Sequence, residues 1–248
     1  LQAVKESIRQ DMRAPSRAMN ALAIDWKSLN FVRYLGHGAQ GVVVLVEKDG
    51  QPMALKLFYS QFSDYFPSAF IVQKHLGFLE MAPNVTGYLD DKSSTLFVDS
   101  VVQQLPKRAV INRTFEYAIL MEFVDQIFLK DVRKSIPVTP EEKKALTSRA
   151  HEILAVLPQI GIHAADIDAV VTSDKKLILV DFGFYEVEGF TRLSGLVIFS
   201  NFRYSKKSLL LDIKRKTSTL RVRWDRFIET LGFDKSEGVN GAAHPDLR

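Results

Sequence analysis

Three glycines followed by a run of valines constrain the fold of this chain more than any other feature. The stretch YLGHGAQGVVVLVEKDGQPMALKLF contains the spacing G-x-G-x-x-G at Gly36, Gly38 and Gly41. A β-branched run follows, and Asp49-Gly50 favours a tight turn before a second apolar run. The pattern predicts an antiparallel hairpin that opens with a glycine-rich loop. By itself, the spacing fits either a nucleotide-phosphate loop or a plain hairpin.

Composition excludes several classes of site. The chain has 248 residues and no cysteine, which excludes disulfides, a thiol nucleophile and cysteine-ligated zinc. It is long enough for one large domain or for one domain split into two lobes. We expect no transmembrane segment, because no apolar run reaches about 18 residues. The first residues, LQAVKESIRQDMRAP, predict an amphipathic helix instead of a signal peptide.

The net charge of +4 is unevenly distributed. The segment 203–226 carries a cluster of basic side chains opposed only by Asp212 and Asp225. Such a cluster suits a polyanion, namely an inositol phosphate or an acidic lipid surface, or else an acidic protein, although a solvated helix face gives the same pattern. Nucleic acid is a less fitting partner, because few aromatic residues are interleaved. The basic residues are Arg203, Lys206, Lys207, Lys214, Arg215, Lys216, Arg221, Arg223 and Arg226.

Periodicity and turn signals predict an α+β chain. Strands are expected at 31–35, 42–47, 52–58, 95–102, 117–123, 169–172 and 177–180. Helices are expected at 1–25, from Pro67 to about Glu80, and over TPEEKKALTSRAHEILAVLPQ, which begins with a helix cap. The end of the chain is expected to be mostly helical, with RVRWDRFIETLGF as its clearest segment.

Five motifs, taken in chain order, resemble those of the protein kinase family. The resemblance covers about 30–185, and the ordered set is more specific than any single motif. The matching segments are GHGAQGVV at 36–43 for the glycine loop, MALK at 53–56 for the lysine strand, AILMEFV at 118–124 for the hinge, GIHAADI at 161–167 for the catalytic loop, and DFG at 181–183.

This resemblance implies a bilobal protein kinase-like fold. Its N-lobe would be a five-stranded antiparallel sheet plus one helix over 26–121. Its C-lobe would be short and mostly helical over 122–248, with the basic segment near its end. Residues 1–25 would form an N-terminal helical extension.

The resemblance also implies how ATP would bind. The three glycines would let backbone N–H groups approach the phosphates, with Val43 beside them. Lys56 would pair with the phosphates, although a lysine that extends to solvent is the alternative. Glu122 C=O and Val124 N–H would bind the adenine ring, with Met121 behind it.

The resemblance implies that three aspartates carry the chemistry. Asp166 would orient the attacking hydroxyl and accept its proton. Asp181 would hold Mg²⁺ or Mn²⁺ on the phosphates, and the alternative for Asp181 is a simple turn cap. In a shortened catalytic loop, Asp168 would lie near the place of the family's metal-binding asparagine and serve as a second metal ligand.

The chain departs from the family pattern at three positions. Ala164 replaces the catalytic-loop histidine. The asparagine position, counted from Asp166, falls on Val171, which cannot bind a metal. The glutamate that pairs with the lysine is missing, because its place falls near Ala69. The nearest polar candidates for that role are Gln73, Asp64 and Glu80.

The implied function is an ATP-dependent phosphotransferase of the serine/threonine protein kinase type, in a divergent form. Its acceptor would be a hydroxyl group of a protein or of a small molecule. If its site is incomplete, the enzyme would require an activator. The alternatives are a nucleotide-binding pseudokinase that acts as an interaction module, and nucleotidyl transfer on the same fold. The absence of an A-P-E motif and the short second half resemble minimal kinases of bacterial effectors and phages. A soluble cytoplasmic location, or secretion into a host cytoplasm as a virulence effector, would follow.

Overall fold

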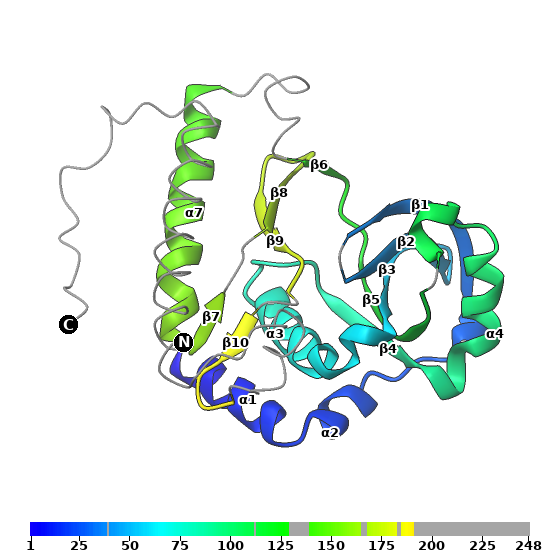
Figure 1. Ribbon diagram of the computed structural model, residues 1–248. Coiled ribbons are helices and arrows are strands. Elements are labelled where there is room, and N and C mark those ends of the chain that lie inside the picture. Colours follow the sequence, from blue (N-terminus) through cyan, green and yellow to red (C-terminus); the bar gives the residue numbers. More distant parts are fainter. Residues whose placement is uncertain (39, 112, 129–138, 165–167, 183–184, 191–248) are drawn as a thin grey trace, which may run out of the picture.

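The glycine–valine hairpin forms as predicted and lies within a five-stranded antiparallel sheet of strand order β1-β2-β3-β5-β4 (Figure 1). The computed structural model describes residues 1–38, 40–111, 113–128, 139–164, 168–182 and 185–190. Asp49 and Gly50 have φ values of 53° and 77°, the left-handed pair that a two-residue hairpin requires. The strands are β1 (Leu29–His37), β2 (Gly41–Lys48), β3 (Gln51–Tyr59), β4 (Val85–Asp90) and β5 (Phe115–Glu122).

Helices cover both faces of this sheet. After the short turn η2 (Ser60–Tyr65), α3 (Phe66–Phe78) packs against one face, where Phe66 contacts Phe58 with a ring-centroid distance of 5.1 Å. On the opposite face, α4 (Asp91–Val102) and α5 (Lys107–Val110) close a separate apolar cluster with the turn η1 (Trp26–Ser28). The sheet is therefore the wall between two cores.

The strand predicted at 95–102 is wrong, because this segment lies in α4. Its β-branched residues favour a strand, but Phe97, Val101 and Leu105 are all buried at a spacing of four residues, which is the helical period. The fifth strand of the sheet is instead β4. The expectation of a single helix beside the sheet is corrected as well, since α4 and α5 accompany α3.

The second half begins directly after β5 and builds two smaller sheets around a long helix. The strands predicted at 169–172 and 177–180 are confirmed and form a hairpin, β8 (Asp168–Thr172) and β9 (Leu177–Val180), and β6 (Gln126–Phe128) pairs with β8. The strand β7 (Ile162–Ala164) pairs with β10 (Tyr185–Val187). The mostly helical content expected here is met only by α7 (Pro140–Gln159) in the part that the structure describes. The basic segment and the predicted helix RVRWDRFIETLGF lie outside the described residues.

The helix α7 (Pro140–Gln159) starts at the cap that the sequence predicts. Thr139 Oγ1 accepts a hydrogen bond of 3.1 Å from Glu142 N–H, and Glu142 Oε2 accepts one of 2.8 Å from Thr139 N–H. This reciprocal pair satisfies two backbone donors that a helix start otherwise leaves unpaired. No helix among the described residues is long and apolar enough to cross a membrane.

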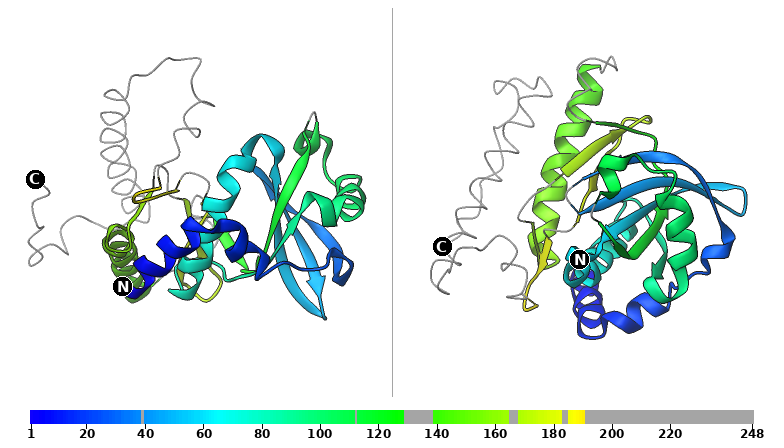
Figure 2. Two further views of the ribbon diagram at one scale, coloured as in Figure 1. Left: turned by 90° about the horizontal axis from the view of Figure 1, so that it is seen from below. Right: turned by 45° about the vertical axis from the view of Figure 1, so that its right-hand side comes forward.

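The N-terminal extension is helical in α1 (Gln2–Arg13) and α2 (Pro15–Asn20), as predicted, and then becomes extended. Ala23 forms a parallel bridge with Tyr88, so the extension covers the edge strand β4. Figure 2 shows α1 and α2 spanning the distance from α7 to the sheet, with α3 between these two parts.

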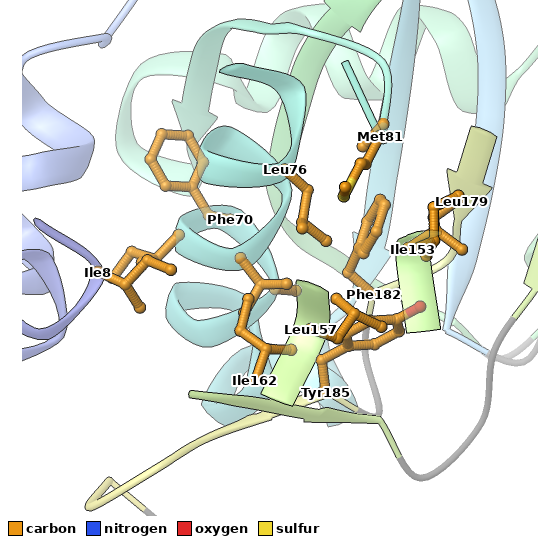
Figure 3. Packing of buried hydrophobic residues seen from close by; sticks show 14 of the residues in the cluster. Ile8, Phe70, Leu76, Met81, Ile153, Leu157, Ile162, Leu179, Phe182 and Tyr185 are labelled. Carbon is orange, nitrogen blue, oxygen red and sulfur yellow. The ribbon is translucent and has the colours of Figure 1, made fainter. Parts of the chain in front are cut away.

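One apolar cluster joins the two halves of the chain (Figure 3). Phe70 and Leu76 of α3 meet Leu157 of α7, Leu179 of β9 and Phe182 in this cluster. Because a core buried between both halves excludes water from each, the cluster fixes where β9 ends relative to the first sheet.

We expect acid to destabilise the protein through His75. Burial lowers the pKa of His75, against the opposing effect of the Asp11 carboxylate. The pKa of Asp11 also lies below its ordinary value. Burial raises this pKa, but the hydrogen bonds from Lys74 and His75 together lower it by more. The neutral imidazole is therefore favoured in the folded state. Its stabilising contribution is complete above the ordinary histidine pKa of about 6.5 and is lost as the pH falls below that value.

The measurement is the free energy of unfolding by denaturant between about pH 7 and pH 5. We predict a fall in wild type and a shallower slope in His75→Gln, with the exposed His151→Gln as control. An unchanged slope in His75→Gln would contradict the assignment.

Candidate functional site

The two faces of the first sheet differ in exposure. Residues opposite each other in an antiparallel sheet share a face, so Val43, Lys56 and Ile119 lie on one face. On the other face Val44 and Leu55 are fully buried. Val43 is only partly buried, as are Leu45 and Met121 on the same face. The Lys56 face therefore retains an apolar, partly accessible surface.

Lys56 forms an ion pair with Asp181. Lys56 Nζ lies 2.9 Å from Asp181 Oδ1, although the two residues are 125 positions apart in the chain. The lysine side chain is 11% exposed and the aspartate 33%. Lys56 Nζ also lies 4.8 Å from the ring centroid of Phe58. A nearly buried ammonium requires a compensating anion, and Asp181 supplies it.

The backbone at Asp181 adopts a left-handed conformation, with φ of 62°. Aspartate tolerates this region better than most residues, but such conformations still cost of order 1–3 kcal/mol. Phe182 follows and is buried against Tyr185, with a ring-centroid distance of 5.2 Å. The buried phenylalanine anchors the chain, and the strained residue before it directs a carboxylate toward Lys56.

The three glycines of the loop differ in whether the surrounding structure requires a glycine. A Cβ on Gly41 would lie 2.1 Å from the Leu57 carbonyl oxygen, so close packing of β2 on β3 requires glycine there. A Cβ on Gly36 or Gly38 would meet nothing within 4 Å. Neither has a positive φ, which among the described glycines occurs at Gly50, Gly161 and Gly189. Packing therefore explains Gly41, whereas neither packing nor backbone conformation requires glycine at Gly36 or Gly38, where the space for a Cβ is open.

The segment after β5 offers polar backbone groups at the edge of the Lys56 face. Glu122 is fixed by Asn84, which accepts a bond of 2.9 Å from Glu122 N–H and donates its side-chain amide to the Glu122 carboxylate at 3.2 Å. Within the described part of the chain, no backbone carbonyl accepts a hydrogen bond from Val124 N–H. Asp125 C=O accepts a bond of 3.1 Å from Ser173 N–H, which ties this segment to the β8–β9 turn.

No acidic residue of α3 reaches Lys56. Ala69, at the expected place of a glutamate, is buried in the core. Gln73 is buried too, but its amide donates to Met121 Sδ at 2.9 Å and to Pro83 O at 3.4 Å. Asp64 and Glu80 are exposed, and among the described residues the ion-pair partner of Lys56 is Asp181. The sequence singles out Gln73 by its polarity in an apolar helix, but its role as the support of Met121 is not readable there.

Strand pairing brings the segments around Asp166 and Asp181 together. Ala164 pairs with Tyr185, and Asp168 pairs with Val180. The described residues on either side of 165–167, Ala164 and Asp168, therefore lie beside β10 and β9. Asp166 and Gly183 themselves lie outside the described residues, and the structure places only the backbone of Asp168. Val171 is fully buried in the core, in agreement with its exclusion as a metal ligand.

Few oxygen atoms that could bind a metal lie beside Lys56 in the part of the chain that the structure describes. No group of three or more His, Asp or Glu side chains that could hold a metal occurs in the described ranges. Asp181 provides one partly exposed carboxylate. Mg²⁺ characteristically binds one or two carboxylates and completes its shell with water and substrate phosphates. The residues present therefore fit a magnesium ion that is held jointly with a nucleotide.

No protein-family model matches the chain, and no curated protein matches it.

The glycine loop gives a three-variant test. We predict that Gly41→Ala lowers the free energy of unfolding by roughly 1–3 kcal/mol, because the new methyl group collides with the β3 backbone. Gly36→Ala and Gly38→Ala should leave stability within about 0.5 kcal/mol, as substitutions in open space do.

If the loop covers phosphates, the last two variants instead weaken ATP binding about tenfold, an affinity change of about 1.4 kcal/mol. Denaturant unfolding and calorimetric titration measure the two effects separately. Normal ATP affinity in both Gly36→Ala and Gly38→Ala would exclude the phosphate role of the loop.

Proposed function

We propose that this chain is an ATP-dependent phosphotransferase that transfers the γ-phosphate to a hydroxyl group. The observation that carries the proposal is the Lys56–Asp181 ion pair of 2.9 Å on the open face of the sheet. A cation and an anion held there, under a loop whose Gly36 and Gly38 leave room for a ligand, suit a metal–polyphosphate group.

A protein kinase-like, two-lobed architecture is part of this proposal. It is supported by the antiparallel sheet with α3 on one face, by the short connection from β5 to β6, and by the placement of Asp181 directly after β9. On this basis the first lobe spans 26–121 and the second begins at 122. The order of the motifs along the chain supports the same division.

In the proposed complex, Lys56 binds the nucleotide phosphates with its ammonium group. Asp181 and the phosphates would hold Mg²⁺, which supplies neutralisation of the charge that develops during transfer. The glycine loop would cover the phosphates and shield them from water. Gly38 N–H, which donates a bond of 3.0 Å to Gly41 O in this structure, would have to exchange that bond for one to a phosphate oxygen. The adenine ring packs on Val43 and Met121, with Glu122 C=O and Val124 N–H as its polar contacts.

Asp166 is proposed to act on the acceptor. It would accept a proton from the attacking hydroxyl and hold that oxygen in line with the phosphate. Asp168 is proposed as a second metal ligand, which its backbone pairing beside Val180 supports. The acceptor is a protein or small-molecule hydroxyl. A polyanion at 203–226 and an effector-type location remain predictions of the sequence.

A nucleotide-binding pseudokinase is the second candidate. The specific observation in its favour is that Lys56 and Asp181 satisfy each other while α3 supplies no acidic partner to the lysine. A site with this arrangement would bind a nucleotide and present a surface to a partner without transferring phosphate.

We predict that wild-type protein transfers label from γ-labelled ATP in the presence of Mg²⁺ or Mn²⁺. Lys56→Met and Asp181→Asn should each reduce the rate about 100-fold or more, because each removes a charge aimed at the transferring group. Asparagine suits the left-handed backbone at Asp181, so the second variant removes charge with little added strain.

The matched controls are Lys48→Met and Asp174→Asn, which disrupt exposed ion pairs elsewhere in the two parts of the chain. Transfer that survives in both site variants would overturn the proposal. Absence of transfer in wild type, with an ATP-induced rise in melting temperature that Asp181→Asn abolishes, would favour the pseudokinase.

Substitutions of Asp166 and Asp168 should have different effects on nucleotide binding and on phosphate transfer. We predict that Asp166→Ala abolishes transfer but keeps the wild-type dissociation constant for Mg²⁺–ATP, because a base contacts the acceptor and not the nucleotide. Asp168→Asn should weaken ATP binding only when the metal is present. Calorimetric titration with and without Mg²⁺ measures both effects. Equal losses of binding in the two variants would contradict the separate roles.

A further inference from the structure

Helix α1 contacts both α3 and the segment that follows Asp181. One face of α1 meets α3, and another meets the turn that follows β10. Figure 3 shows Ile8 of α1 directed at the core beside Phe70 of α3. Ile8 is fully buried in the cluster that also contains Phe182 and Tyr185.

The contact with α3 is ionic as well as apolar. Asp11 Oδ2 lies 2.9 Å from Lys74 Nζ and 2.9 Å from His75 Nε2. These groups are mostly shielded from water, since the side chains of Asp11, Lys74 and His75 are 22%, 20% and 6% exposed. One carboxylate therefore holds two adjacent residues in the last part of α3, and shielding makes this bond stronger than an exposed pair.

The contact with the segment after Asp181 is made by a second carboxylate. Glu188 Oε2 lies 2.6 Å from Lys5 Nζ and 3.3 Å from Arg9 Nη2. Glu188 N–H donates a bond of 2.8 Å to Gly161 O, which joins the turn to the start of β7. Lys5 and Arg9 thus form ion pairs with the chain a few residues beyond Phe182.

Nothing in the described part of α3 itself ties this helix to Lys56 or Asp181 by charge. The route from α3 to the lysine is apolar, through the Phe66 and Phe58 rings. Charge-assisted bonds are directional, so ion pairs from α1 would add a constraint on the position of α3 to the one that the apolar cluster supplies.

We propose that α1 is a positioning element of the Lys56–Asp181 site, acting through Asp11 on α3 and through Glu188 on the segment that follows Asp181. The assignment to a phosphate-transfer site rests on the proposed function. The geometric claim, that α1 holds the ion pair together, does not.

The first test needs no nucleotide. Glu188→Arg places a cation against Lys5 and Arg9, and the triple variant Lys5→Glu, Arg9→Glu, Glu188→Arg restores opposite charges. Glu152→Arg is the matched control, because it reverses an exposed carboxylate whose partner is Arg149 on α7. The readout is the rate at which an amine-reactive reagent labels Lys56, quantified by mass spectrometry.

We expect a several-fold faster labelling of Lys56 in Glu188→Arg, a return toward the wild-type rate in the triple variant, and the wild-type rate in Glu152→Arg. An unchanged rate in Glu188→Arg overturns the proposal. So does an accelerated rate that the triple variant fails to reverse, since that outcome indicates general loosening.

The second test links α1 to the proposed function. Glu188→Arg should weaken Mg²⁺–ATP binding in the wild-type background but not in Asp181→Asn, because α1 acts through Asp181. Equal weakening in both backgrounds would show a merely structural role. If wild type binds no ATP but the labelling result holds, the proposed function fails and the positioning role stands. If ATP binds and labelling is unchanged, only the positioning role fails.

Discussion

The ion pair between Lys56 and Asp181 is the interaction on which the arrangement of the chain depends. It joins the central strand of the first sheet to the end of β9, 125 residues later. An ammonium in an apolar strand is costly unless an anion reaches it, and a left-handed aspartate is costly unless its surroundings hold it. The bond therefore offsets both costs, because Asp181 compensates the charge of Lys56 and Lys56 holds the Asp181 carboxylate in place. The apolar cluster around Leu76, Leu179 and Phe182 provides the scaffold that brings them within bonding distance.

The two faces of the first sheet are covered to different extents. The face of Val44 and Leu55 is sealed by α4 and α5, while the face of Val43 and Lys56 is covered by α3 only in part. The Lys56 face is therefore the place in the described sheet where we propose that a ligand binds. The open positions at Gly36 and Gly38 lie on the loop that borders this place.

Local sequence signals predicted the local structure well, because their causes act over a few residues. The Asp49-Gly50 turn, the Thr139 cap and the β8–β9 hairpin are of this kind. The strand prediction at 95–102 is wrong because β-branched composition favours a strand there, whereas the four-residue spacing of the buried Phe97 and Val101 is that of a helix. Of the site, the sequence supplied the residue types and, through family resemblance, their roles. It could not supply the Gln73–Met121 bond or the contacts of Asp11 and Glu188, because such pairings depend on how distant elements pack.

In the proposed complex, Lys56 and Asp181 no longer bond to each other and instead bind a ligand. A crystal structure with a non-hydrolysable ATP analogue and Mg²⁺ is the most direct measurement of this claim. We predict that the phosphates lie beneath the glycine loop, with Lys56 Nζ bonded to a phosphate oxygen and the Asp181 carboxylate bonded to the metal. An analogue bound elsewhere, or a direct Lys56–Asp181 bond unchanged with the phosphates out of reach of both, would contradict it.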